Sequence, residues 1–144
     1  MTDTKLEQFA RDSVDAFNRS DWDAIREMTC PGYVYEETGT GRRFDGVDDT
    51  LGALKEWKEA APDATGEVVR VVTEGDTTVM EIVWRGTQTG PLNTGAGELP
   101  ASGKAFEVQA SMWQTWRGGK LADERHHLDV LTMLAQLGAI PASV

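Results

Sequence analysis

Residues 105–128 read AFEVQASMWQTWRGGKLADERHHL, and their pattern determines the fold class that we predict. Over 105–116 the apolar side chains occupy every second position, namely Phe106, Val108, Ala110 and Met112. This period of two is typical of a β-strand with one buried face. The tight turn Arg117-Gly118-Gly119 leads into a second strand, predicted over 121–128. Strands joined by so short a turn pair antiparallel, so the stretch predicts a long hairpin.

The same period appears upstream of this hairpin. Val, Ile and Thr are abundant over 67–73 and 77–87, and Glu74-Gly75-Asp76 between them is a turn signal. A shorter β-prone run, 33–35, leads into a glycine-rich bend over 39–46. We therefore expect several connected antiparallel strands.

Helical spacing of apolar residues dominates the first third of the chain. The residues that share one face there are Leu6, Phe9, Ala10, Val14 and Phe17. Thr4 and Glu7 have the spacing of a capping box, which predicts where this helix begins. Ser20 is expected to cap a second, short helix that ends at Pro31, and a third helix is expected to end before Pro62.

Helices therefore flank the strands, and a last short helix is predicted over 130–137. This arrangement is typical of an α+β domain, and the length of 144 residues fits a single domain, 1–144. One segment, 88–103, is a long loop with four glycines and two prolines. Such loops are often lids or ligand-binding loops, and an exposed loop without a role is the alternative.

Composition excludes several classes of function. The chain has 14 Lys and Arg against 24 Asp and Glu, a net charge of −10 that disfavours binding to nucleic acid or to an anionic membrane surface. No apolar run approaches the roughly 20 residues of a membrane span, and the N-terminus has no signal-peptide pattern. The single cysteine, Cys30, excludes an internal disulfide and a cysteine-based metal site. We therefore expect a soluble, cytoplasmic protein.

Several short motifs occur in an order that resembles the SnoaL-like polyketide cyclases, or ester cyclases, of the NTF2-like superfamily. In sequence order they are Phe17-Asn18 with Asp21, Gly75-Asp76, Gly86-Thr87 with Gly90, Pro100 with Gly103-Lys104, Gly119-Lys120-Leu121, and Asp129 with Leu134, Gln136, Leu137 and Gly138. Each motif alone is common, whereas the ordered set covers nearly the whole chain and is fairly specific.

The resemblance implies a cone-shaped, strongly curved antiparallel sheet wrapped by the N-terminal helices, with a hydrophobic pocket in its mouth and usually a homodimer. It also implies ring closure by an intramolecular aldol reaction without a cofactor, in which an acidic side chain near the C-terminal strand removes a proton next to a carbonyl. That position is His126 in this chain. At two further positions the cyclases carry histidine, whereas this chain has Gln88 and Met112 there.

The densest group of acid/base side chains is the stretch 123–129, Asp-Glu-Arg-His-His-Leu-Asp. On a strand, alternate residues face opposite sides, so Glu124 and His126 share one face. The other face carries Asp123, Arg125, His127 and Asp129. Only one of these two sets can line a cavity. The position that the resemblance implies for the base is His126, and its ordinary pKa of about 6.5 suits proton transfer at neutral pH, so we predict His126 as the base.

Three neighbours of His126 are further catalytic candidates: Arg125, His127 and Asp129. Asp129 also stands where the last helix begins, so an N-cap is its alternative role. An ion pair within the strand is the alternative for Arg125. Adjacent histidines on opposite strand faces cannot share one metal ion, so we expect no metal. The expectation that no cofactor is needed comes from the resemblance to the cyclases.

The chain is rich in aromatic residues for its size, and a planar ligand stacks on such side chains. The expected ligand contacts are Tyr33, Tyr35, Trp84, Gln88, Gln109, Met112 and Trp113. Packing in the hydrophobic core is the alternative role for each aromatic residue. The expected partner is therefore a small hydrophobic molecule, and the resemblance implies a second copy of the chain as a further partner.

These observations give three hypotheses about function. The first is an enzyme of the SnoaL-like cyclase type that uses acid/base chemistry on a small or medium hydrophobic carbonyl compound, by cyclisation or isomerisation. The second is an epoxide or ester hydrolase of the limonene epoxide hydrolase type, with Asp123, Arg125 and Glu81 activating water. The third is a non-catalytic, dimeric ligand-binding module.

Overall fold

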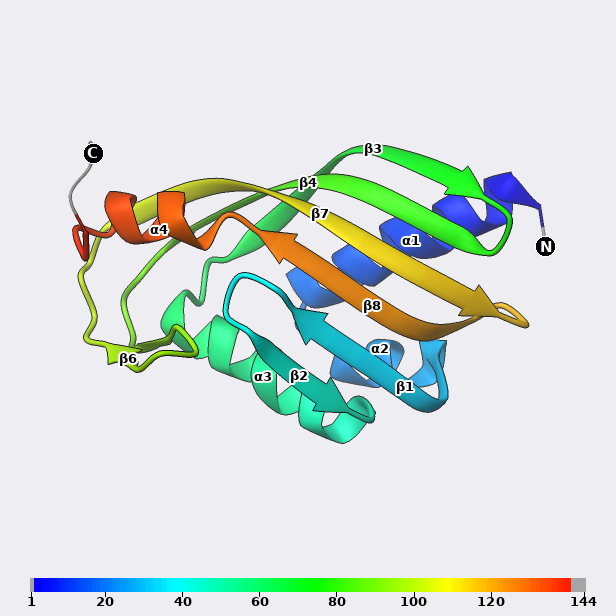
Figure 1. Ribbon diagram of the computed structural model, residues 1–144, viewed down its shortest axis with the longest axis horizontal. Helices are drawn as coiled ribbons and strands as arrows, with labels where there is room; N and C mark the ends of the chain where they lie inside the picture. The colour runs from blue at the N-terminus through cyan, green and yellow to red at the C-terminus, as the bar shows by residue number, and fades with distance from the viewer. Residues whose placement is uncertain (1, 141–144) are drawn as a thin grey trace.

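A computed structural model describes residues 2–140 of the chain (Figure 1). Its helices are α1 (Asp3–Asn18), α2 (Trp22–Met28), α3 (Val47–Ala60) and α4 (Val130–Gln136). Its strands are β1 (Thr29–Glu37), β2 (Arg42–Asp45), β3 (Thr65–Glu74), β4 (Thr77–Thr87), β5 (Leu92–Asn93), β6 (Glu98–Leu99), β7 (Ala105–Arg117) and β8 (Lys120–Leu128). Within these residues, no helix is long and apolar enough to cross a membrane.

The main sheet has six strands in the order β2-β1-β8-β7-β4-β3. The predicted hairpins β3–β4 and β7–β8 are present and antiparallel, as is the β4–β7 pair between them. The exception is β1, which pairs with β8 in parallel and places Tyr35 opposite Glu124 and Glu37 opposite His126. Local periodicity did not predict this pair, because a period of two says nothing about which strand lies alongside.

Helices cover one face of the sheet, and Figure 1 shows α1 and α3 behind the strands. Helix α1 packs against β3 and β4, and α3 packs against β1 and β2. Apolar residues of α1 such as Leu6 and Ala10 are buried against strand residues such as Met80 and Ile82. The opposite side, which we call the outer face, carries exposed residues such as Trp113. The cavity described below lies on the helix side.

Two predicted helix caps differ in the structure. The cap of α1 is Thr2 and not Thr4, because Thr2 has extended backbone and its hydroxyl accepts from Lys5 N at 3.3 Å. The cap of α2 is Asp21, which accepts from Ala24 N at 3.1 Å. Ser20 instead follows the end of α1 and has a left-handed φ of 55°, a conformation that commonly terminates a helix.

Strands occupy two regions where the sequence predicted a break. Strand β1 runs through Pro31-Gly32, and its register with β8 shifts between Thr29 and Val34, which accommodates this dipeptide. Strand β2 lies within the predicted glycine-rich bend and pairs with β1. The first part of the bend is therefore the turn of the β1–β2 hairpin, and the rest of it is strand β2.

The loop 88–103 is held in place from within. It contains the short antiparallel pair β5–β6. Gln88 is buried, and its Nε2 donates to the carbonyls of Gly90 and Pro100, each at 3.1 Å. Its Oε1 accepts from Ser102 N at 3.3 Å. Gln88 therefore ties the two ends of the loop together.

Candidate functional site

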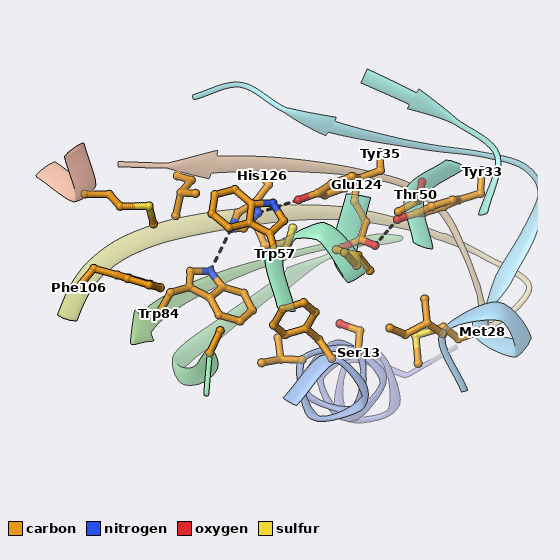
Figure 2. A pocket seen from close by; sticks show the side chains of 18 residues that line it. Ser13, Met28, Tyr33, Tyr35, Thr50, Trp57, Trp84, Phe106, Glu124 and His126 are labelled. Carbon is orange, nitrogen blue, oxygen red and sulfur yellow. Dashed lines mark hydrogen bonds between the residues drawn. The ribbon is translucent and has the colours of Figure 1, made fainter. Parts of the chain in front are cut away.

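A cavity of about 80 Å³ lies between the helices and the sheet (Figure 2). The lining residues are Ser13, Val14 and Phe17 of α1, Ile25 and Met28 of α2, Thr50, Leu54 and Trp57 of α3, the strand residues Tyr33, Tyr35, Trp84, Phe106, Met112, Glu124, His126 and Leu128, and also Ala64 and Met133. The wall is mostly apolar and aromatic, as ligand sites commonly are. Since a cavity that holds benzene has about 150 Å³, a ring-sized ligand requires some of these side chains to move.

Strand β8 supplies the carboxylate and the imidazole that line the cavity. Glu124 and His126 are two positions apart, so both side chains point to the helix side. Figure 2 shows them directed toward the same space as Tyr33 and Tyr35 of the neighbouring strand β1. The parallel pairing of β1 with β8 thus brings two tyrosines and two titratable groups onto one wall.

His126 is buried and hydrogen-bonded through both ring nitrogens. Trp84 Nε1 donates to His126 Nε2 at 3.1 Å, and the Tyr35 hydroxyl lies 3.0 Å from His126 Nδ1. An indole N–H can only donate, so Nε2 carries the lone pair and the proton is on Nδ1. Burial lowers the pKa of His126 to about 4, with a smaller effect of His127 in the same direction. The imidazole is therefore neutral at neutral pH.

The hydrogen bonds of His126 continue to a buried carboxylate. The Tyr35 hydroxyl donates to Glu37 Oε2 at 3.0 Å, and Trp57 Nε1 donates to the same oxygen at 2.7 Å. Arg42 Nη2 lies 3.0 Å from Glu37 Oε1, so this carboxylate has a cationic partner. Burial raises the pKa of Tyr35 well above its ordinary value, with Glu37 acting in the same direction, so the hydroxyl stays a donor.

Glu124 accepts from a second set of donors. The Tyr33 hydroxyl donates to Glu124 Oε1 at 2.5 Å, and Gln114 Nε2 donates to Oε2 at 3.2 Å. The orientation of the Gln114 amide follows from its other partner, Thr78, whose hydroxyl donates to Oε1 at 3.1 Å. Thr78 in turn accepts from the donor-only Trp116 Nε1 at 2.9 Å.

No cation balances the charge of Glu124. None of the ion pairs found within residues 2–140 includes it. Burial raises the pKa of Glu124, the hydrogen bonds from Tyr33 and Gln114 oppose this, and Asp123 adds to the increase. Glu124 nevertheless keeps some accessible surface, because it lines the cavity. A partly desolvated carboxylate on a cavity wall is a typical candidate for proton transfer.

The structure places five of the predicted site residues in the cavity wall. They are Tyr33, Tyr35, Trp84, Met112 and His126. Trp57 and Glu124 also lie there, although the sequence did not single out either as a ligand contact. Strand alternation was a usable signal for Glu124, because it had already grouped Glu124 with His126.

The other predicted site residues lie elsewhere, in each case for a structural reason. Gln109 and Trp113 of β7 and Arg125 and His127 of β8 alternate with cavity-facing residues, so they point to the outer face. Gln88 ties the loop 88–103. Asp129 is the N-cap of α4, with its carboxylate accepting from Thr132 N at 3.1 Å, the alternative role that the sequence suggested.

The outer face also carries the residues of the hydrolase hypothesis. Asp123 and Arg125 alternate with the cavity-facing residues of β8, and Glu81 lies 3.9 Å from Arg70, where both side chains are exposed. Gln109, His127 and Asp129 border an open depression on this face. Among residues 2–140, no three His, Cys, Asp or Glu side chains are grouped so that they could hold a metal ion.

Comparison with known proteins agrees with this architecture. The model of the SnoaL-like polyketide cyclase family matches residues 7–137 of the chain. No curated protein sequence matches it. A proposed SnoaL-like polyketide cyclase from Jannaschia sp. CCS1 superposes with a TM-score of 0.84 at 22% identity, over 96% of this chain and 94% of that one.

Several similar structures come from Streptomyces, and TsrD and IdmH are two of them. TsrD from Streptomyces laurentii superposes with a TM-score of 0.82 at 24% identity, over 97% of this chain and 99% of that one. IdmH from Streptomyces antibioticus, a proposed polyketide cyclase, superposes with a TM-score of 0.78 at 28% identity, over 92% of this chain and 98% of that one. The predicted α+β fold with a curved antiparallel sheet is confirmed.

Proposed function

The chain belongs to the SnoaL-like polyketide cyclase family, and we propose that it is a cofactor-independent acid/base enzyme acting on a small or medium hydrophobic carbonyl compound bound in the cavity. The reaction class is intramolecular cyclisation or isomerisation, which begins with the loss of a proton next to a carbonyl. The apolar wall suits such a substrate, because it excludes the water that would compete for a reactive intermediate.

One observation carries this proposal: a partly buried glutamate with a raised pKa, Glu124, lies on the cavity wall, and no residue within 2–140 forms an ion pair with it. A carboxylate of this kind is a stronger base than one in water, and it still becomes ionised as the pH rises past its pKa. Proton transfer by a positioned side chain typically contributes about 10²- to 10⁴-fold to a rate.

The geometry favours Glu124 over His126 as the base. The Nε2 lone pair of His126 is occupied by the Trp84 indole, and a pKa of about 4 makes the imidazole a weak acceptor at neutral pH. His126 instead donates from Nδ1 to the Tyr35 hydroxyl and so fixes the orientation of that ring. We therefore assign His126 a positioning role.

The proposed first step is a proton transfer to Glu124. The carboxylate takes a proton from the carbon next to the substrate carbonyl, and the electron pair of the broken C–H bond forms an enolate. In a cyclisation this enolate carbon attacks a second carbonyl of the same molecule, and Glu124 returns its proton to the alkoxide oxygen that forms. In an isomerisation Glu124 returns the proton to another carbon.

Deuterium uptake tests this step without knowledge of the natural substrate. The probe is 2-tetralone in D₂O, a hydrophobic ketone whose α-protons are followed by proton NMR. We expect the wild type to accelerate exchange and Glu124→Gln to lose about 100-fold or more of that acceleration. Glu98→Gln, a change of the same kind at an exposed site, is the control. Exchange that is unaccelerated, or undiminished in Glu124→Gln, would remove the proposal.

The same assay bears on the alternatives. The hydrolase hypothesis lacks support from the cavity, because Asp123, Arg125 and Glu81 lie on the outer face. A non-catalytic module would bind the ketone without accelerating exchange.

We also propose a homodimer formed through the outer face. Val72 pairs with Val79, and Val79 with Trp113, so the three side chains form one row across β3, β4 and β7. Val72 and Trp113 are 52% and 45% exposed. An uncovered apolar row of this kind is typical of an interaction surface, and a two-fold axis would pair it with itself.

A further inference from the structure

The side-chain donors on the cavity wall are all engaged with protein acceptors. The Ser13 and Thr50 hydroxyls donate to the carbonyls of Ala10 at 2.6 Å and Gly46 at 2.9 Å. Those of Tyr33 and Tyr35 donate to Glu124 and Glu37, the indoles of Trp57 and Trp84 donate to Glu37 and His126, and His126 Nδ1 donates to Tyr35. A ligand therefore meets no free side-chain N–H or O–H on this wall.

Oxygen lone pairs, in contrast, remain available. Each oxygen of Glu124 accepts one hydrogen bond, whereas an ionised carboxylate has about four acceptor sites. The other buried glutamate, Glu37, is a useful comparison, because it accepts from Tyr35, Trp57 and Thr40 and is paired with Arg42. Glu124 has neither that number of donors nor a cation.

From this contrast we propose that the ligand of the cavity donates a hydrogen bond to Glu124. The substrate class is then a hydrophobic compound that carries a hydroxyl, an enol or a protonated amine. A compound whose polar atoms only accept would bury them without a partner and would bind more weakly. The inference rests on the proposed function only in taking this cavity as the substrate site.

The inference is compatible with carbonyl chemistry. Before proton transfer, the donor group of the ligand binds one oxygen of Glu124, and the other oxygen takes the proton from the carbon next to the carbonyl. After Glu124 has taken the proton, it becomes the one donor among the cavity's side chains that is not already engaged with the protein. It then donates to the enolate oxygen, so the charge that develops is met by the group that produced it.

Three small ring compounds test the donor preference by equilibrium binding. Phenol donates as a neutral group, benzylamine donates as a cation at neutral pH, and anisole only accepts. Dissociation constants come from NMR titration of the tryptophan indole N–H resonances. We expect at least one donor to bind about tenfold more tightly than anisole, the equivalent of roughly 1.4 kcal/mol. Preference for phenol alone identifies a neutral donor, and preference for benzylamine alone identifies a cation. Anisole binding as tightly as both donors would overturn the inference.

A variant assigns the preference to one residue. The amide of Glu124→Gln has N–H donors of its own, so phenol and benzylamine should lose their advantage over anisole. Glu98→Gln should keep the wild-type ranking. An unchanged ranking in Glu124→Gln would overturn the inference, and the wild-type ranking stands as a test even if this variant does not fold.

The two proposals on this cavity fail separately. A donor preference without deuterium exchange, at a 2-tetralone concentration above its own dissociation constant, supports the binding inference and removes the proposed reaction. Accelerated exchange without a donor preference removes the inference and supports the reaction.

Discussion

Trp84 Nε1 donates to His126 Nε2 across 3.1 Å, and this contact determines which nitrogen of the buried histidine carries its proton. A second indole acts in a similar way on the hydrogen bonds that lead to Glu124. Trp116 donates to Thr78, so the Thr78 hydroxyl must donate to Gln114. Each series of hydrogen bonds begins at a tryptophan that can only donate and ends at a glutamate, Glu37 in the first series and Glu124 in the second. The two tryptophans therefore determine which group donates and which accepts in each of these hydrogen bonds.

Removing the Trp84 donor should raise the pKa of His126. In Trp84→Phe, Nε2 is free to take a proton, so the pKa should increase from about 4 toward its ordinary value of 6.5. The chain contains two histidines, so NMR titration of the imidazole protons resolves His126, with His127 as internal reference. A pKa that stays at about 4 would show that burial alone sets it.

Stability should fall in acid because of His126. The folded state binds a proton near pH 4 and the unfolded chain near pH 6.5, so the stabilisation is complete above pH 6.5 and is lost between pH 6.5 and 4. The full loss is about 3 kcal/mol. Urea unfolding over this range should show a smaller slope in His126→Gln than in the wild type. Equal slopes would contradict the buried, neutral histidine.

Glu124 should act with the opposite sign. Its pKa is raised above 4.5 in the folded state, so folding favours the protonated form, and this contribution is lost as the pH rises through the folded pKa. The unfolding free energy of the wild type should therefore decrease relative to that of Glu124→Gln as the pH increases from 4.5. A difference between the two proteins that does not change with pH would count against the raised pKa.

The Glu37–Arg42 ion pair should be costly to break from one side. Glu37 is 1% exposed, so Arg42→Met leaves a buried carboxylate without its cation and should cost about 3–5 kcal/mol in urea unfolding. Adding Glu37→Gln should recover part of this loss. The control is Glu56→Gln, which removes the exposed partner of Arg42 and should cost less than about 1 kcal/mol. Equal costs for the two single variants would mean that burial does not matter here.

The proposed dimer should depend on Trp113. Trp113→Ser removes the largest side chain of the row on the outer face, so sedimentation velocity should show a shift from dimer to monomer. Leu131→Ser is the matched control, since Leu131 is 66% exposed but lies on α4, away from that row. A wild type that sediments as a monomer, or a Trp113→Ser variant that stays dimeric, would exclude this interface.

The sequence predicted those features of the fold that depend on local pattern. Both long hairpins follow from alternation and turn residues, and the bounds of β4 agree with the predicted 77–87. Alternation also grouped Glu124 with His126 correctly. The preference for His126 as the base came from its position in the family and from its ordinary pKa, and burial lowers that pKa in a way that a pattern of residues does not reveal.

The remaining site residues depend on contacts between distant segments. Glu37 gains its importance from Trp57 on α3 and Arg42 on β2, and no local pattern links these positions. Similarly, Gln88 was a candidate because it stands where the cyclases carry histidine, but its amide donates to backbone carbonyls at both ends of the loop 88–103. Tertiary hydrogen bonding decided both cases.

The parallel pairing of β1 with β8 bears on when the protein becomes competent during its synthesis. The hydrogen bond between Tyr33 and Glu124 joins residues that are 91 positions apart, as does the contact of Tyr35 with His126. Closing a loop costs more conformational entropy when the two residues are further apart in sequence, so contacts of such separation tend to form late in folding. A nascent chain therefore carries α1, α2, α3 and the β3–β4 hairpin before β8 has been made, and the cavity wall is complete only when β8 has left the ribosome and paired with β1.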